Sequence, residues 1–292
     1  MKTEAEKRES AFAAMALTVP AAEAAVGKNW LPVLIVALAA WLLCSWTAGE
    51  RPAIPGWLSG LRIVTMVLLI AWILERTSEP WPGRGSRFVV PLALLALAVV
   101  SVRKGAEQAA AAAGVLRYGI YSILAVLMVA GLGDIPWKSL TPKAELPDGP
   151  LTAVMLLPLL AVHRKEQGNP LPIAAILASV VTVGATSLYE YSRGLSIAGA
   201  AEHLESLAAC AITVGYFGTV SWLLDGCAAE RDQSGKRNRW EIFGTAAAAY
   251  AVYLLRIPHA PWLYAALELL FWGILPLLVA PKRKRKKMDK DA

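Results

Sequence analysis

Residues 57–73, WLSGLRIVTMVLLIAWI, decide the class of fold, because a single charged residue interrupts a long apolar run. A helix needs about 20 largely apolar residues to cross a bilayer, and segments of this kind recur along the chain between short polar stretches. Hydrophobic residues make up 57% of the sequence and charged residues 17%. This composition is typical of a polytopic membrane protein. The sequence therefore predicts an all-α membrane protein.

Ten segments account for the apolar part of the chain. Two of them are short and defective: residues 11–26 contain Pro20, and residues 151–162 contain Pro158. We expect a membrane domain over residues 11–280, between an N-terminus of residues 1–10 and a basic tail of residues 281–292. The predicted full spans are residues 29–48, 57–73, 88–102, 115–132, 174–188, 207–224, 243–255 and 262–280.

The distribution of Lys and Arg predicts the orientation. The tail at 282–290 carries seven basic residues, and a loop expected at 225–239 carries four. Strict alternation of ten segments then puts nineteen basic residues on one side and eight on the other. By the positive-inside rule, both termini are expected in the cytoplasm. The net charge of +7 therefore requires no nucleic-acid partner, and the tail is expected to contact anionic lipid.

The N-terminus also allows a different interpretation. Residues 11–19 resemble the apolar core of a signal peptide. Acidic residues precede this core, and another span follows Pro20 closely, which favours a membrane segment. Whether the segment spans, is cleaved or lies on the surface stays open.

Most of the eleven tryptophans lie near the ends of predicted segments. There an indole can keep its ring in lipid and its N–H in water. Trp41 and Trp72 lie deeper. Eight are predicted to be interfacial anchors: Trp30, Trp46, Trp57, Trp81, Trp137, Trp222, Trp240 and Trp262.

Enzymatic, metal and redox chemistry find little support. Cys44, Cys210 and Cys227 lack metal-ligand spacing and are expected to be free thiols, with Cys227 in a cytoplasmic loop. The three histidines are isolated, and no phosphate-binding loop or nucleophile elbow is present. We therefore expect no enzyme, no cofactor and no metal.

Polar residues within or beside spans are expensive and so point to function. Glu190 and Arg193 lie three residues apart on one helical face, and His203 and Glu205 open the next long helix. These four residues are predicted to form a gating or coupling cluster. The alternative is a solvated interfacial loop. Glu268 is expected to face the bundle.

Prolines break three of the predicted segments. Pro20, Pro91 and Pro158 each remove a backbone donor, and a broken helix at membrane depth is tolerated only around a cavity. Pro20 lies in the first segment and Pro158 in the sixth, which fits a five-plus-five inverted repeat with broken helices. Kinked helices that pack without any ligand are the alternative.

Residues 187–226 resemble the eighth-helix region of the endospore germination permeases, the membrane B subunits of spore germinant receptors in the amino acid–polyamine–organocation superfamily. The similarity continues through residues 81–140, including Pro91 and Gly105. Relative to that family, the first helix is truncated, and His203 stands where the family favours Arg. The residues that match the family pattern are Leu188, Glu190, Arg193, Glu202, Leu204, Glu205 and Leu207.

The resemblance implies a protein of the cell or spore inner membrane that senses or passes a small germinant such as an amino acid, together with other germinant-receptor subunits. The ligand is expected between the two broken segments. Thr18 and Pro20 would contribute from the first, and Met155 and Pro158 from the sixth. Two alternatives are an ion-coupled secondary transporter of amino acids or cations and a scaffold subunit that transports nothing.

Overall fold

The computed structural model describes residues 12, 15–20, 32, 35, 36, 38, 39, 56–78, 85–104, 106–131, 154, 155, 157–161, 198–231, 239–255 and 261–279. Across these ranges the regular structure is helical and contains no strand, so the all-α prediction is confirmed for this part of the chain. The elements are α3 (Gly56–Ser78), α4 (Ser86–Arg103), α5 (Ala106–Gly131), α7 (Leu157–Ala161), α9 (Ala198–Arg231), α10 (Arg239–Leu254), α11 (Pro261–Glu268), the π-helical η3 (Leu269–Ile274) and α12 (Leu275–Val279).

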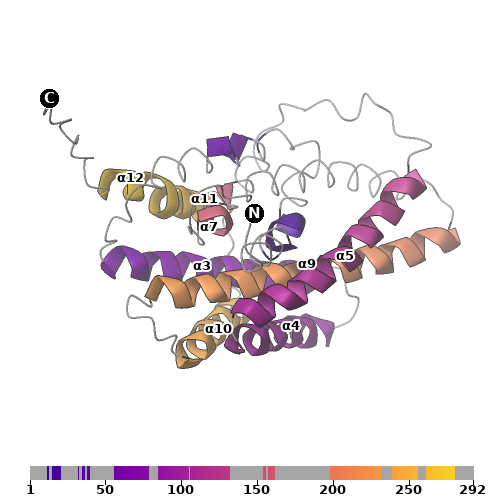
Figure 1. The fold of residues 1–292 in the computed structure, drawn as a ribbon, viewed down its shortest axis with the longest axis horizontal. Helices are drawn as coiled ribbons and strands as arrows, with labels where there is room; N and C mark the ends of the chain where they lie inside the picture. The colour runs from indigo at the N-terminus through magenta and orange to yellow at the C-terminus, as the bar shows by residue number, and fades with distance from the viewer. Residues whose placement is uncertain are drawn as a thin grey trace, which may run out of the picture.

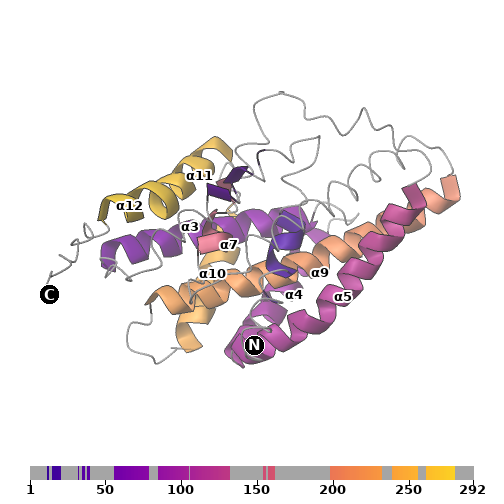
Figure 2. The ribbon, with the colours of Figure 1, turned by 45° about the horizontal axis from the view of Figure 1, so that its top comes forward.

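Helix α9 organises the bundle. It packs against α3, α4, α5 and α10, and Figures 1 and 2 show it running beside α3 along part of its length and beside α5 along another. In both views α11 and α12 lie on the side of α3 away from α10. A helix with neighbours on several sides must be apolar around much of its circumference. This explains why α9 reads as a nearly continuous apolar run.

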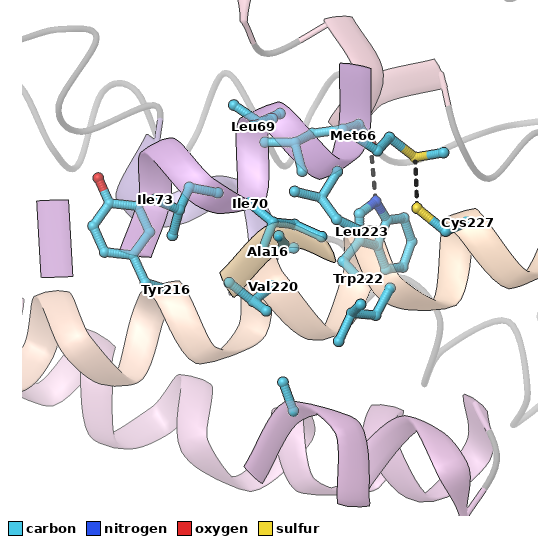
Figure 3. Packing of buried hydrophobic residues seen from close by; sticks show 14 of the residues in the cluster. Ala16, Met66, Leu69, Ile70, Ile73, Tyr216, Val220, Trp222, Leu223 and Cys227 are labelled. Carbon is cyan, nitrogen blue, oxygen red and sulfur yellow. Dashed lines mark hydrogen bonds between the residues drawn. The ribbon is translucent and has the colours of Figure 1, made fainter. Parts of the chain in front are cut away.

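The seam between α3 and α9 shows their relative direction. The thiol of Cys227 lies 3.7 Å from the sulfur of Met66. Along the same seam, Ile73 of α3 lies near Tyr216 of α9 (Figure 3). Since residue numbers rise on one helix as they fall on the other, the two helices are antiparallel. Their buried faces form the centre of the apolar core.

One helix in the described part of the chain, α3, is long and apolar enough to cross a membrane by length and composition. A shorter apolar helix runs over Trp262–Ile274. Five other predicted segments also lie on described helices: residues 88–102, 115–132 up to Gly131, 207–224, 243–255 up to Leu254, and 262–280 up to Val279. Residues 174–188 lie outside the described ranges, and the total of ten spans stays a prediction.

Two details of the sequence interpretation are wrong. The loop expected from Asp225 onward is helical as far as Arg231, because α9 continues through it. Asp225 is buried there instead of ending the helix in water. Cys227 is therefore not a loop residue, and it is only 4% exposed within the core.

Pro91 does not break α4, which is helical on both sides of it. A proline cannot donate to the carbonyl four residues earlier, which here belongs to Arg87. The hydroxyl of Tyr253 on α10 donates to that carbonyl instead. A side chain from a neighbouring helix thus satisfies the backbone group that the proline leaves without a partner.

Candidate functional site

The first defective segment lies buried against α9. Residues 15–20 are helical and end, as described, at Pro20. Pro20 has no N–H for the carbonyl of Ala16, four residues earlier. The hydroxyl of Thr219 on α9 donates to this carbonyl at 2.8 Å. The proline thus creates an acceptor in the core, and α9 supplies its donor.

Two glycines of α9 allow this close approach. A Cβ placed on Gly215 would lie 2.0 Å from Cγ2 of Val19, and one placed on Gly218 would lie 2.8 Å from Cγ of Met15. Side chains on these positions would force residues 15–20 away from α9. The glycines therefore form a notch that holds the first segment against the helix.

The sixth segment contacts α9 at Trp222, about one helical turn beyond Thr219. Helix α7 is a short helix, so its last carbonyls have no partners within it. The indole Nε1 of Trp222 donates to the carbonyl of Leu159 at 3.0 Å (Figure 3). The ring of Phe12 packs edge-on against the same indole, with centroids 4.9 Å apart and an interplanar angle of 86°. Trp222 therefore connects both defective segments.

The structure brings the four predicted ligand residues to buried positions around α9. Thr18 is 1% exposed and Met155 is 4% exposed. Pro20 and Pro158 are also buried. The segments that carry them share Thr219 and Trp222, which lie three residues apart on one face of α9.

The four side chains of the predicted polar cluster lie outside the part of the chain that the structure describes. Glu190 and Arg193 lie outside the described residues. His203 and Glu205 lie in the first turns of α9, which begins at Ala198. The structure describes the backbone of these two residues and not their side chains. The role of the cluster as a gate stays a prediction.

Two functional candidates were missed from the sequence. Trp222 was interpreted as an interfacial anchor, which is wrong, because its side chain is 1% exposed and bonds to Leu159. Nothing in the sequence singles out Thr219, since a single Thr in an apolar run is common. The available signal was Pro20, which implies a carbonyl at Ala16 that needs an outside donor.

The resulting site offers paired donors and acceptors inside an apolar shell. The carbonyls of Ala16 and Leu159 accept hydrogen bonds, and Thr219 and Trp222 donate them. Within the described ranges, no three His, Cys, Asp or Glu side chains gather as metal ligands would.

The comparisons with known proteins add no further information. No protein-family model, curated protein or solved structure matches this chain.

Proposed function

We propose that this chain is an integral membrane protein with a permease-like bundle of about ten helices, and that it binds a small molecule where its two interrupted segments meet α9. The observation that carries the proposal is that Thr219 and Trp222 of one helix donate to a backbone carbonyl in each of the two segments. In transporters with discontinuous helices, such backbone groups hold the substrate.

The distribution of apolar side chains supports a membrane location. Large hydrophobic side chains remain exposed along α4, α10 and the C-terminal helices, and Leu278 is 73% exposed. Polar and charged side chains such as Arg62, Asp225 and Glu268 are buried instead. Exposed apolar surface of this extent marks an interaction surface, and a bilayer is the partner that covers many helices together. The exposed apolar side chains include Phe88, Val89, Leu92, Leu97, Val100, Phe243, Leu255, Leu263, Leu270 and Leu278.

Tryptophans at the helix ends support the same placement. Trp57, Trp240 and Trp262 are exposed near the starts of α3, α10 and α11. An exposed indole at a helix end is typical of a membrane–water interface.

The class of ligand follows from the bonds that it would replace. The ammonium group of an amino acid can donate to the carbonyls of Ala16 and Leu159. Its carboxylate can accept from the Thr219 hydroxyl and the Trp222 indole, once these release the carbonyls. Opening the two internal bonds therefore exposes donors and acceptors for both ends of a zwitterion. The described arrangement, with these bonds made, corresponds to a closed state.

The germination role rests on the resemblance of residues 187–226 to the endospore germination permeases. On this basis the chain senses or passes a germinant amino acid and works with other receptor subunits in the cell or spore inner membrane. Capture of the ligand would shift a two-state bundle toward one conformation. The cluster of Glu190, Arg193, His203 and Glu205 would gate or couple that change.

Two other functions remain candidates. An ion-coupled transporter would use the same site to move amino acids or cations across the membrane. A scaffold subunit would assemble partners and bind no small molecule.

Deletion of the gene, followed by germination assays over an amino-acid panel, separates these functions. A germinant receptor loses the response to particular amino acids, a transporter loses their uptake, and a scaffold loses its partner subunits from the membrane. Complementation with Gly215→Ala then tests the site, with Gly244→Ala as the matched control because its Cβ would meet nothing within 4 Å. The proposal predicts a lost amino-acid response with Gly215→Ala alone. A full response from both variants would exclude ligand binding at this notch.

A further inference from the structure

We propose that Glu268 is a proton-binding site at the seam between α3 and the π-helical segment η3. The inference rests on the membrane location proposed above for these helices. It does not depend on the germinant, on transport or on the site at α9.

The position of Glu268 along α3 follows from contacts on either side of it. Tyr264 of α11 interacts electrostatically with Glu75 near the end of α3. The indole of Trp272 donates to the hydroxyl of Thr65 at 3.0 Å. The C-terminal helix is therefore antiparallel to α3, and Glu268 lies between these two levels, beside the middle of α3 (Gly56–Ser78). In a membrane-spanning α3, this is the depth at which a charge is most expensive.

The carboxyl group of Glu268 is enclosed. The side chain is 2% exposed, and its Oε2 atom has no hydrogen-bond partner within the described structure. A buried carboxylate without a partner for each oxygen is strongly disfavoured, whereas a carboxylic acid can occupy such a place at much lower cost. Burial and geometry together therefore favour the protonated form in the arrangement described.

A fixed guanidinium lies about one helical turn away. Nε of Arg62 donates to the carbonyl of Phe271 at 3.2 Å, and its Cζ lies 4.6 Å from the centroid of the Trp272 ring. These two contacts hold the guanidinium, and the Trp272 ring is itself positioned by its hydrogen bond to Thr65, one turn along α3 from Arg62. Arg62 is itself buried, at 3% exposure.

The π-helical register explains why the Phe271 carbonyl is available to Arg62. The N–H of Leu275 donates to Leu270, five residues back. The next donor in this register would be residue 276, which is a proline and has no N–H. Arg62 supplies the missing donor. Single π-helical turns are frequent at functional sites, and this one begins directly after Glu268.

The surroundings favour a proton over a metal cation. The described titratable or charged groups on the facing elements are Arg62, Glu75 and Arg76 of α3 and Tyr264 of α11, while α7 and α12 each contribute only apolar residues and a proline. A sodium or calcium ion needs several oxygen ligands, and a single carboxylate beside a guanidinium does not provide them. A proton needs one oxygen: the carboxylate accepts H⁺ from water and becomes the neutral acid, with no other bond made or broken.

Infrared spectroscopy of the purified protein in lipid nanodiscs tests this assignment directly. We expect a carboxylic acid C=O band at neutral pH that is lost in Glu268→Gln and kept in the control Glu241→Gln on α10. Glu268→Asp keeps an acid group at the site, so it should retain the band at a shifted frequency. Glu268→Asp provides the test if the Glu268→Gln variant does not fold.

Raising the pH should remove the band as the acid ionises, and adding sodium chloride at constant pH should leave it unchanged. A band that persists in Glu268→Gln would overturn the proposal, as would its absence from both the wild type and Glu268→Asp. Loss of the band on adding sodium would show a metal-cation site and would also overturn it. None of these readouts needs a germinant, so a failed ligand site at α9 would leave their result unaffected.

Discussion

Thr219 illustrates how one side chain compensates for a proline in another segment. Its hydroxyl has one proton, and the carbonyl of Ala16 at 2.8 Å is closer than that of Gly215 in its own helix at 3.3 Å. The Thr219 hydroxyl therefore donates its proton to the carbonyl of Ala16, in the other segment. Without it, the Ala16 carbonyl would be a buried acceptor with neither a helical donor nor water.

The first prediction concerns this hydroxyl. Thr219→Val should lower the free energy of unfolding in lipid bicelles by about 1–3 kcal/mol, the cost of an unsatisfied buried acceptor. Thr77→Val is the matched control, because Thr77 is also fully buried but donates at 2.8 Å to Leu74 within its own helix. It should cost about 0.5 kcal/mol, at the low end for a lost hydrogen bond. Equal losses would show that the Thr219–Ala16 contact has no special weight.

The second prediction concerns the glycine notch. Gly215→Ala should destabilise the protein by about 1–3 kcal/mol, since Val19 leaves no room for a methyl group and its segment must move. Gly244→Ala has open space and removes a flexible residue from a helix, so it should be neutral or stabilise by up to about 1 kcal/mol. Chemical denaturation of both variants measures the contrast. A stable Gly215→Ala protein would mean that residues 15–20 do not pack there.

Single residues show what the sequence could and could not reveal. The acceptor freed by Pro20 is readable because proline chemistry is local, and the carbonyl of Ala16 does accept from another helix. The break at Pro158 stays a prediction, since Leu157–Ala161 is helical around it. The partners of the Ala16 and Leu159 carbonyls, Thr219 and Trp222, cannot be read from the sequence, since they depend on which helix packs beside each segment. Glu268 was expected to face the bundle, and it does. Its relation to Arg62 and the π-helical turn could not be read from the sequence.

At the scale of elements, prolines within helices are compensated repeatedly. The carbonyls of Ala16, Arg87 and Phe271 each lack a helical donor because of a following proline, and each accepts from a side chain of another helix. Where water is scarce, every such backbone group needs a protein partner. In each case the side chain that compensates for the proline also links two packed segments.

The third prediction tests this compensation in α4. Tyr253→Phe should cost about 0.5–1.5 kcal/mol, since it leaves the Arg87 carbonyl without its donor. In a Pro91→Ala background, the backbone N–H of residue 91 can bond to Arg87 itself, and the same Tyr253→Phe change should cost almost nothing. A double-mutant cycle on unfolding free energies measures the coupling. Additive effects would contradict a compensating role for Tyr253.

The length of α9 explains two errors of prediction. The charge of Asp225 predicts the end of a span, and this end would place Trp222 at the interface. The helix in fact continues to Arg231, which places Trp222, Asp225 and Cys227 in the interior. Hydropathy identifies an apolar run well, but it cannot tell a buried charge from an exposed one, because burial is decided by the neighbouring helices.

At the scale of the molecule, the arrangement of polar and apolar groups is the support for the proposed membrane location. Apolar side chains cover outward faces of several helices, and the ionisable side chains of Arg62, Asp225 and Glu268 are enclosed between helices. The helical class could be predicted from composition and segment length alone. The number of spans and the inverted repeat need segments that lie outside the described residues, so they stay predictions.

The fourth prediction concerns orientation. A cysteine introduced by Ala292→Cys, in a background that carries Cys44→Ser and Cys210→Ser, should resist an impermeant maleimide in intact cells and react after permeabilisation. The reason is the excess of basic residues on the predicted cytoplasmic side. Buried Cys227 should stay unreactive in both conditions and so adds no background. Labelling of residue 292 from outside would contradict cytoplasmic termini.

Direct ligand binding tests the central claim, that the two interrupted segments and α9 form a small-molecule site. The purified protein in nanodiscs should bind at least one radiolabelled amino acid from a full panel. Gly215→Ala, which pushes residues 15–20 from α9, should weaken that binding at least about tenfold, equivalent to about 1.4 kcal/mol. Gly244→Ala should bind as the wild type does. Absence of binding across the panel, or equal binding by wild type and Gly215→Ala, would contradict a ligand site at this junction.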